Sequence, residues 1–220
     1  GKYLIAPISK GFRIWDVSSK KILKTKIFPD EPNMIDVGVN NLRFICGNEK
    51  IIAQFGKIYQ NPDDPGNPIT IGNFTVWDFY SLDSIDSFTN SRGFKLSNTC
   101  KYIAYRVSDA DSGIVIYDFL KKEIVQKLAI NGYSLTGLEF SSDDNYLVTS
   151  SGPGTNSLLI WEINSGKEVH RYWPSSYECI DVSNNGLYVL GNVGNIMRLF
   201  KSRFETSTVP LKEEIKKIIY

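Results

Sequence analysis

The feature that most constrains the fold of this chain is a short segment that recurs about every 40 residues. Each copy is an apolar, β-branched stretch that ends in an aromatic residue, usually followed by an acid. The copies end at Trp15-Asp16, Trp77-Asp78, Tyr117-Asp118, Trp161-Glu162 and Phe200. The interval between Trp15 and Trp77 is longer than the others. Self-similarity at this period is typical of folds in which each repeat buries its faces against its neighbours.

A strand, a polar turn and a second strand precede most of these aromatic ends. Residues 39–51, 135–147 and 177–189 align without gaps in this pattern, and residues 94–103 form a fourth copy. A polar turn and an outer strand, such as Glu168–Tyr172, follow the aromatic ends. Short bursts of β-branched and aromatic residues between Gly, Asn, Asp and Ser are typical of many short strands. Each repeat therefore predicts a four-stranded sheet.

The segments 138–150 and 158–169 together resemble a WD40 repeat, and the resemblance covers essentially the whole chain. It implies an all-β fold, a β-propeller of about five WD40-like four-stranded blades. The ring would be either a closed five-blade ring or part of a larger propeller of roughly seven or more blades. In such a fold the recurring aromatic residue fills the space between adjacent blades.

The repeats depart from the family pattern in their polar residues. The Gly-His dipeptide before the first strand is missing from every repeat, and the single histidine, His170, lies in an outer strand. The aspartate expected six residues before the Trp is found once, as Asp111 ahead of Tyr117. We therefore expect that the His, Ser/Thr, Asp and Trp network of the family does not form in the usual way. Apolar burial between sheets should hold the blades together.

The repeat predicts a single β-propeller domain over residues 1–220, with blade ends near residues 28, 90, 130, 173 and 208. Residues 1–5 repeat the turn and second strand of residues 144–148. Residues 209–220 would then be the first strand of a following or closing blade. An amphipathic helix over residues 211–220, with Pro210 in its first turn, is the alternative for this segment.

Composition narrows the partners and the compartment. The 25 Lys and Arg nearly balance the 24 Asp and Glu, so no global field draws in nucleic acid or an anionic membrane. Direct nucleic-acid binding is not expected. Three cysteines without close spacing indicate free thiols in a reducing compartment. With no apolar stretch long enough to span a bilayer, we expect a cytoplasmic location, with the nucleus as the alternative.

The longest insertion, residues 57–68, is the leading candidate for a partner-binding loop. Tyr59 would be its aromatic anchor, while Asp63 and Asp64 match no recognised calcium loop. A tolerated surface excursion is the alternative. Two shorter loops predicted on the same face, 108–112 and 150–155, are the next candidates. In the aromatic run 172–177, Trp173 is either an exposed contact or a buried packing residue. The candidate partner-binding residues are Tyr59, Asp63, Asp64, Asp109, Trp173 and Tyr177. The expected structural repeat residues are Trp15, Asp16, Trp77, Asp78, Asp111, Tyr117, Asp118, Trp161 and Phe200.

Enzyme signatures are missing from the sequence, and we expect no catalytic residue, cofactor or metal. The acids after the aromatic residues occupy repeat-equivalent positions, which indicates architecture, because a catalytic residue is normally needed once. The sequence favours a non-catalytic scaffold that binds other proteins within a multi-subunit complex, through loops on one propeller face. The alternatives are a propeller enzyme with a metal or quinone in the axial channel and an RNA-associated or translation-factor-type propeller. The remaining blades of a larger propeller are a further candidate partner.

Overall fold

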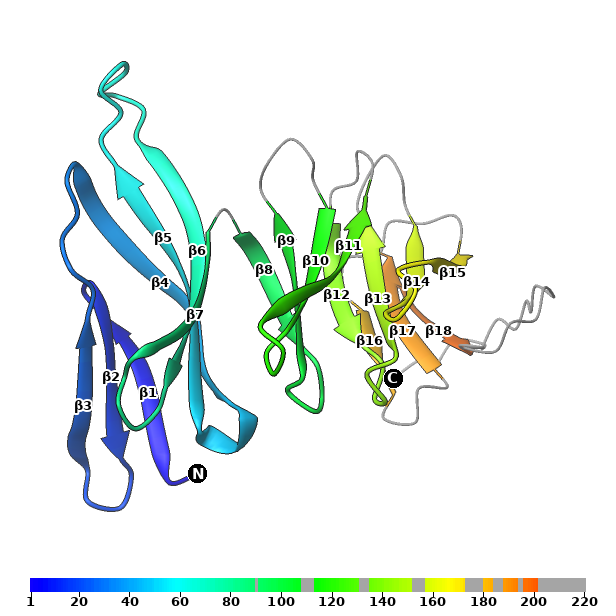
Figure 1. The fold of residues 1–220 in the computed structure, drawn as a ribbon, viewed down its shortest axis with the longest axis horizontal. Coiled ribbons are helices and arrows are strands. Elements are labelled where there is room, and N and C mark those ends of the chain that lie inside the picture. Colours follow the sequence, from blue (N-terminus) through cyan, green and yellow to red (C-terminus); the bar gives the residue numbers. More distant parts are fainter. Residues whose placement is uncertain are drawn as a thin grey trace. The chain divides into compact units, whose positions relative to one another are not determined.

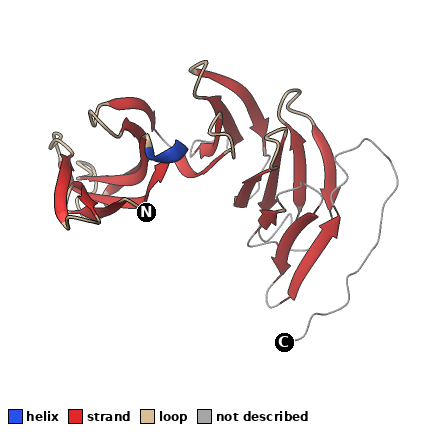
Figure 2. Cartoon of the chain, turned by 90° about the horizontal axis from the view of Figure 1, so that it is seen from below, coloured by secondary structure: helices blue, strands red, loops and turns tan. Residues whose placement is uncertain are grey.

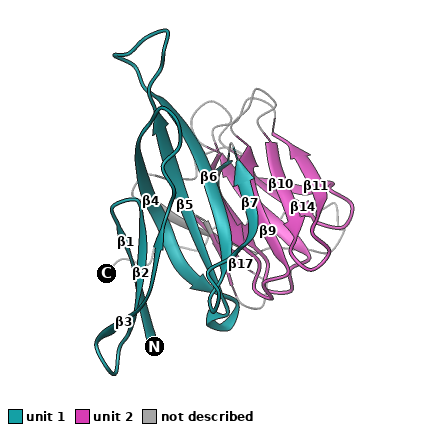
Figure 3. Cartoon of the chain, turned by 60° about the vertical axis from the view of Figure 1, so that its left-hand side comes forward, with its two compact units in different colours: residues 1–93 teal, residues 94–220 magenta. Residues whose placement is uncertain are grey.

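The computed structural model describes residues 1–89, 91–107, 113–130, 135–151, 157–172, 180–183, 188–193 and 196–201. At residues 92, 180, 192, 193 and 196–201 the description is of the backbone. The described chain consists of antiparallel strands and one short 3-10 helix, η1 (Cys46–Asn48) (Figures 1 and 2). It divides into two compact units, residues 1–93 and 94–220 (Figure 3).

The first unit holds two antiparallel sheets, with strand orders β1-β2-β3 and β4-β5-β6-β7. The first sheet consists of β1 (Tyr3–Ile8), β2 (Gly11–Asp16) and β3 (Lys21–Ile27). The second consists of β4 (Met34–Ile45), β5 (Lys50–Tyr59), β6 (Ile69–Asp78) and β7 (Ser84–Thr89).

The second unit holds sheets with strand orders β8-β9-β10-β11, β12-β13-β14-β15 and β16-β17-β18. The first of these has β8 (Ser91–Leu96), which begins in the last residues of the first unit, β9 (Tyr102–Val107), β10 (Gly113–Asp118) and β11 (Glu123–Ala129). The next has β12 (Leu135–Phe140), β13 (Tyr146–Ser151), β14 (Leu158–Glu162) and β15 (Glu168–Tyr172). The last has β16 (Ile180–Val182), β17 (Tyr188–Val193) and β18 (Ile196–Lys201).

The repeated sheets share one irregularity at the recurring aromatic residue. The pairing with the outer strand shifts register immediately before Trp15, Trp77, Tyr117 and Trp161. A β-bulge at this point bends the strand and increases its local twist. These four aromatic residues therefore occupy equivalent places in their sheets, as the sequence repeat predicted.

The acid after the aromatic residue organises the next turn. Asp78 Oδ1 accepts hydrogen bonds from the backbone N–H of Tyr80 and Ser81, both at 2.8 Å. Asp118 Oδ1 binds the two equivalent amides at 2.8 and 3.0 Å, and Asp16 Oδ1 binds the amide of Ser19 at 2.8 Å. An Asp that bonds its own backbone two and three residues on makes an Asx turn. The hydrogen bonds from Ser18 and Ser19 lower the pKa of Asp16 to about 2.

The apolar core of the first unit lies between its two sheets. Phe12 of β2 packs edge-on against Trp77 of β6, with ring centroids 5.4 Å apart, and Phe28 stacks on the same indole at 5.8 Å. Phe55 of β5 and Ile14 of β2 complete this contact. Alternate residues of a strand point to the same face, so β2 presents Phe12 and Ile14 together. Burying such a group of aromatic side chains is a large contribution to sheet-on-sheet packing.

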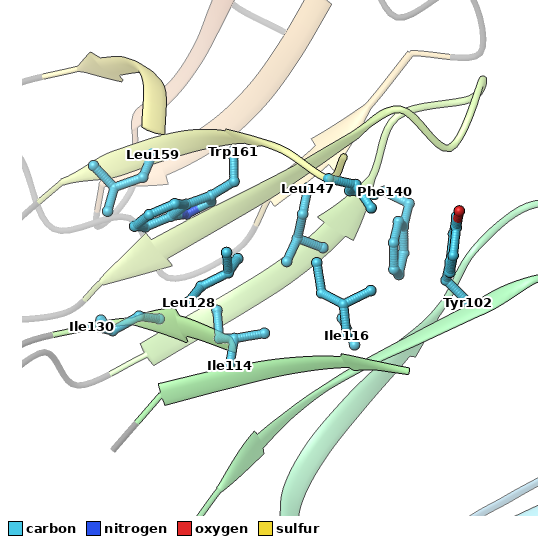
Figure 4. Packing of buried hydrophobic residues seen from close by; sticks show 11 residues of the cluster. Tyr102, Ile114, Ile116, Leu128, Ile130, Phe140, Leu147, Leu159 and Trp161 are labelled. Atoms are coloured by element: carbon cyan, nitrogen blue, oxygen red, sulfur yellow. The ribbon is translucent and has the colours of Figure 1, made fainter. Parts of the chain in front are cut away.

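The same arrangement recurs in the second unit (Figure 4). Ile114 and Ile116 of β10 pack against Leu147 of β13 and Trp161 of β14. In both units, therefore, the face that carries the tryptophan covers the apolar face of the preceding sheet.

A buried carboxylate joins two neighbouring sheets of the second unit. Asp144 lies in the turn between β12 and β13 with a positive φ of 56°. Its side chain accepts hydrogen bonds from the backbone N–H of Asn98, at 2.8 Å, and of Thr99, at 3.0 Å. The hydroxyl of Thr99 donates a further one at 2.5 Å. Both donors lie in the turn between β8 and β9, so a polar clamp supplements the apolar core.

The predicted all-β class and the repeated four-stranded antiparallel sheets are confirmed for the described residues. This arrangement is consistent with a β-propeller-like fold. The closure of a ring and the number of blades stay predictions. The segment 209–220, predicted as a strand or a helix, lies outside the described residues.

Candidate functional site

Strands β4, β5 and β6 extend well beyond the outer strand β7. Pairing between β6 and β7 ends at Asn73 opposite Thr89, whereas β5 and β6 stay paired up to Tyr59 opposite Ile69. We call residues 34–38, 56–59 and 69–72, with the connecting turn 60–68, the arm (Figures 1 and 3). The sequence placed the whole of 57–68 in a loop. That boundary was wrong, because residues 57–59 belong to β5 and pair with β4 and β6.

The arm is held by an acidic residue from the segment that precedes β4. Glu31 Oε2 accepts a hydrogen bond from the hydroxyl of Tyr59 at 2.5 Å, and its other oxygen pairs with Lys57 Nζ. The backbone N–H of Gln60 donates to the carbonyl of Asn33 at 2.9 Å. The hydrogen bond to Glu31 raises the pKa of Tyr59 to about 12, and the bonds from Lys57 and Tyr59 lower the pKa of Glu31. Tyr59, predicted as a partner-binding anchor, thus braces the arm.

The two faces of the arm differ. On one face, Val37 and Phe55 are buried in the core of the first unit. On the other, Gly38, Gly56 and Gly72 lie side by side in one row of the three strands. A Cβ added at Gly38 would meet nothing within 4 Å. A Cβ added at Gly56 would meet Thr70 Cγ2 at 3.5 Å, so the row is open at Gly38 and partly covered at Gly56.

The turn at the end of the arm presents acidic side chains. Asp63 and Asp64 are both exposed. The backbone N–H of Asp63 donates to Asn61 Oδ1 at 3.1 Å, and that of Asn67 donates to the carbonyl of Asp64 at 3.0 Å. Within the described part of the chain, neither carboxylate has an ion-pair partner. These bonds use backbone atoms of the two aspartates, so their carboxylates remain available to another molecule.

The recurring aromatic residues are placed by their sheets and not by a binding site. Trp77 and Trp161 are 3% and 7% exposed, whereas Trp15 is half-buried. Its cross-strand partner Leu4 is 57% exposed, although the equivalent Ile51 is fully buried. In the described part of the chain, the face of the first sheet that carries Trp15 therefore lacks the cover that Trp77 receives.

Several predicted residues cannot be placed. Asp109, Asp111, Trp173 and Tyr177 lie outside the described residues, and Phe200 lies on β18, where the backbone alone is described. The structure therefore brings Tyr59, Asp63 and Asp64 together in the arm and leaves the other candidate contacts as predictions.

Sequence reasoning missed the groups that hold the arm and the sheets. Glu31 is separated from Lys57 by 26 residues and from Tyr59 by 28, so no local pattern signals their contact. The sequence showed Asp144 only as one of the acids in a predicted polar turn. Thr149 accepts a hydrogen bond from Trp161 Nε1 at 3.0 Å, which is one part of the network expected to be lost. In the sequence, the only signal of this hydrogen bond was a hydroxyl residue near the recurring tryptophan.

The remaining features that bear on function are the cysteines, the possible metal-binding side chains and the helix of the described residues. Neither Cys46 nor Cys100 forms a disulfide. Among the described residues, no group of three or more His, Cys, Asp or Glu is arranged to hold a metal ion. No helix in this part of the chain has the length and apolar character that crossing a membrane requires.

No family model matches the chain. Part of it is similar to cilia- and flagella-associated protein 52. The similarity to the protein from Chlamydomonas reinhardtii is 29% identity over 79 residues, which is 34% of this chain and 12% of that protein. The mouse protein is 36% identical over 50 residues, which is 23% of this chain and 8% of that protein. The matched region is thus a small part of these relatives.

Two solved structures share the fold. A putative 6-phosphogluconolactonase from Bacteroides fragilis superposes with a TM-score of 0.61 at 14% identity, over 98% of this chain and 67% of that chain. The hydrazine synthase of Kuenenia stuttgartiensis gives a TM-score of 0.63 at 11% identity, over 93% of this chain and 70% of that chain. At these identities the similarity concerns the fold alone.

Proposed function

We propose that this chain is a non-catalytic scaffold that binds other proteins within a larger assembly, in the cytoplasmic part of cilia or flagella. The observation that carries the proposal is that the repeated aspartates bind backbone amides in turns. Asp16, Asp78 and Asp118 cap turns at equivalent places in three sheets. These repeated carboxylates serve the architecture, which leaves the exposed side chains of the arm for recognition.

Rigidity supports this use. The arm is braced by Glu31 on one side and rests on Phe55 and the core of the first unit. A preformed surface binds a partner with little loss of conformational entropy. The names of the partly similar proteins agree with a structural part in cilia or flagella, and no enzyme activity is inferred from the solved structures.

Affinity purification from flagellated cells tests the proposal. The full chain would be compared with a variant in which residues 60–68 are replaced by a short Gly/Ser linker. We expect the intact chain to retain the same proteins in constant proportion and the linker variant to lose at least one of them. A matched control, Glu49→Lys with Asp83→Lys, changes exposed acids at the opposite end of the same sheet. Recovery of no protein beyond that seen with an unrelated bait would refute the scaffold function.

A further inference from the structure

Among the described strands, none pairs with the outer edge of β6 in the arm. Strand β7 pairs with β6 only from Asn73 onward, so residues 69–72 have β5 on one side and no described strand on the other. Ile69 is 46% exposed and Thr70 is exposed. In an antiparallel strand, alternate residues direct their N–H and C=O groups to each side. Half of the backbone groups in this stretch therefore face outward.

The free edge is short and begins directly after Pro68, but within residues 69–72 it lacks other features that usually prevent pairing with another chain. Natural edge strands are blunted by charged residues, by proline or by a bulge. Residues 69–72 read Ile-Thr-Ile-Gly, with neither a charge nor a proline, and their pairing with β5 is regular. The β-branched residues favour an extended backbone. The edge is thus exposed at Ile69 and Thr70, half-buried at Ile71 and Gly72, and already in the conformation that a further strand needs.

Charge around the edge indicates the chemistry of the partner. Lys57, the cation among the arm's strands and turn, is paired with Glu31. Asp63 and Asp64 are exposed in the turn that leads directly into β6. Opposite charges of a partner would gain from this field and would set its register along the strand. A segment rich in Lys or Arg fits, whereas an acidic one is repelled.

We propose that the edge of β6 at residues 69–72 binds an extended basic segment of a partner protein, which adds as a further strand while its cations face Asp63 and Asp64. The proposal rests on the scaffold function and names the class of partner for the arm. Main-chain hydrogen bonds supply affinity in this mode of recognition, and alternate side chains supply specificity. Gly72 lies on this edge, and an aromatic residue of the added strand beside an edge glycine would stabilise the pair.

Backbone pairing can be tested with the full chain and synthetic peptides. The probe is a peptide of alternating valine and threonine flanked by pairs of lysines. Two further versions carry N-methyl groups on one or the other alternating set of amides, which removes the donors on one edge only. We expect the unmodified peptide to slow hydrogen exchange at alternate amides of residues 69–72. One methylated version should bind about as well, and the other at least about tenfold more weakly.

Charge reversal tests the assigned register. Asp63→Lys with Asp64→Lys should weaken binding of the unmodified peptide by about tenfold at low salt and less at high salt. The control Glu49→Lys with Asp83→Lys has the same net charge and should retain most of the affinity. Failure of the wild-type chain to bind the peptide, equal binding of both methylated versions, or protection away from residues 69–72 would overturn the proposal. Partners recovered by the intact chain despite that result would leave the scaffold function standing.

Discussion

The indole Nε1 of Trp161 donates a hydrogen bond to Oγ1 of Thr149 at 3.0 Å. Both side chains are buried, and the bond joins β13 to β14 within one sheet. The residues at the position of Thr149 in the preceding sheets are Ala6, Ala53 and Tyr105. Among these sheets, the fourth is thus the one that gives its recurring aromatic residue a small hydroxyl partner.

Replacing Thr149 with valine should therefore destabilise the chain. Thr149→Val keeps the shape but leaves the buried indole N–H without an acceptor, at a cost of about 2 kcal/mol. Thr149→Ser keeps the hydroxyl and loses one methyl group, at a cost of about 0.8 kcal/mol. Urea unfolding of the three chains measures both changes. A valine variant as stable as the serine variant would show that this hydrogen bond contributes nothing.

Removing the carboxylate of Asp144 should loosen the contact between two sheets of the second unit. Asp144→Ala removes the acceptor of the part-buried hydrogen bonds from the amides of Asn98 and Thr99 and puts alanine at a positive φ, for a total cost of about 2 kcal/mol. Asp144→Asn tolerates that backbone conformation and keeps one acceptor oxygen, so it should lose about half as much. Thermal unfolding ranks the variants. Equal melting temperatures for both would contradict the role of the acceptor.

The turn after the recurring acid offers a stabilising change. Its fourth residue has a positive φ in each described copy, 57° at Lys20, 60° at Leu82, 56° at Lys122 and 66° at Gly166. Lys122 is exposed, so Lys122→Gly should stabilise the chain by about 0.5 to 1 kcal/mol by relieving the backbone conformation. Gly166→Ala should destabilise it, because its Cβ would also lie 2.6 Å from Gln126 Oε1. Denaturant midpoints of the two variants should move in opposite directions.

The repeat and its acids could be predicted because their signals are local. An aromatic residue with an acid beside it recurs at the end of a strand, so Trp77 with Asp78 and Tyr117 with Asp118 were assigned from the sequence as structural repeat residues, whereas the β-bulge and the Asx turn became visible in the structure. The arm was assigned too short, because Pro62, Pro65 and Pro68 suggested a loop whereas cross-strand pairing extends β5 to Tyr59. Glu31 was missed because its contacts are distant in sequence. Tertiary pairing, which no local propensity encodes, decided both.

The stability that the hydrogen bond between Tyr59 and Glu31 contributes should be lost both at high pH and at low pH. The folded pKa of Tyr59 is raised from 10.0 to about 12, so its contribution to stability is complete below pH 10.0 and is lost as the pH rises towards 12. The folded pKa of Glu31 is lowered from 4.5, so its contribution is present above pH 4.5 and is lost as the pH falls below it. The contact therefore stabilises the arm most between these limits.

Tyr59→Phe isolates this contact. At neutral pH the variant should lose about 0.5 to 1 kcal/mol of unfolding free energy, a modest value because Glu31 is partly exposed. The difference from the wild-type chain should shrink above pH 10.0 and also below pH 4.5. Ultraviolet titration of tyrosinate, compared between the two chains, identifies the late-titrating group. A difference in stability that stays constant across this range would contradict the assignment.

Leu4 and Leu147 occupy equivalent places, each paired across strands with the tryptophan of its sheet, yet they are 57% and 0% exposed. Leu147 is covered by the preceding sheet, and nothing described covers Leu4. Leu147→Ala should therefore cost about 2 to 4 kcal/mol, whereas Leu4→Ala should cost less than about 0.5 kcal/mol. Urea unfolding of both variants measures these two losses of stability. A large loss at Leu4 would mean that another sheet covers the Trp15 face in solution, as a closed ring requires.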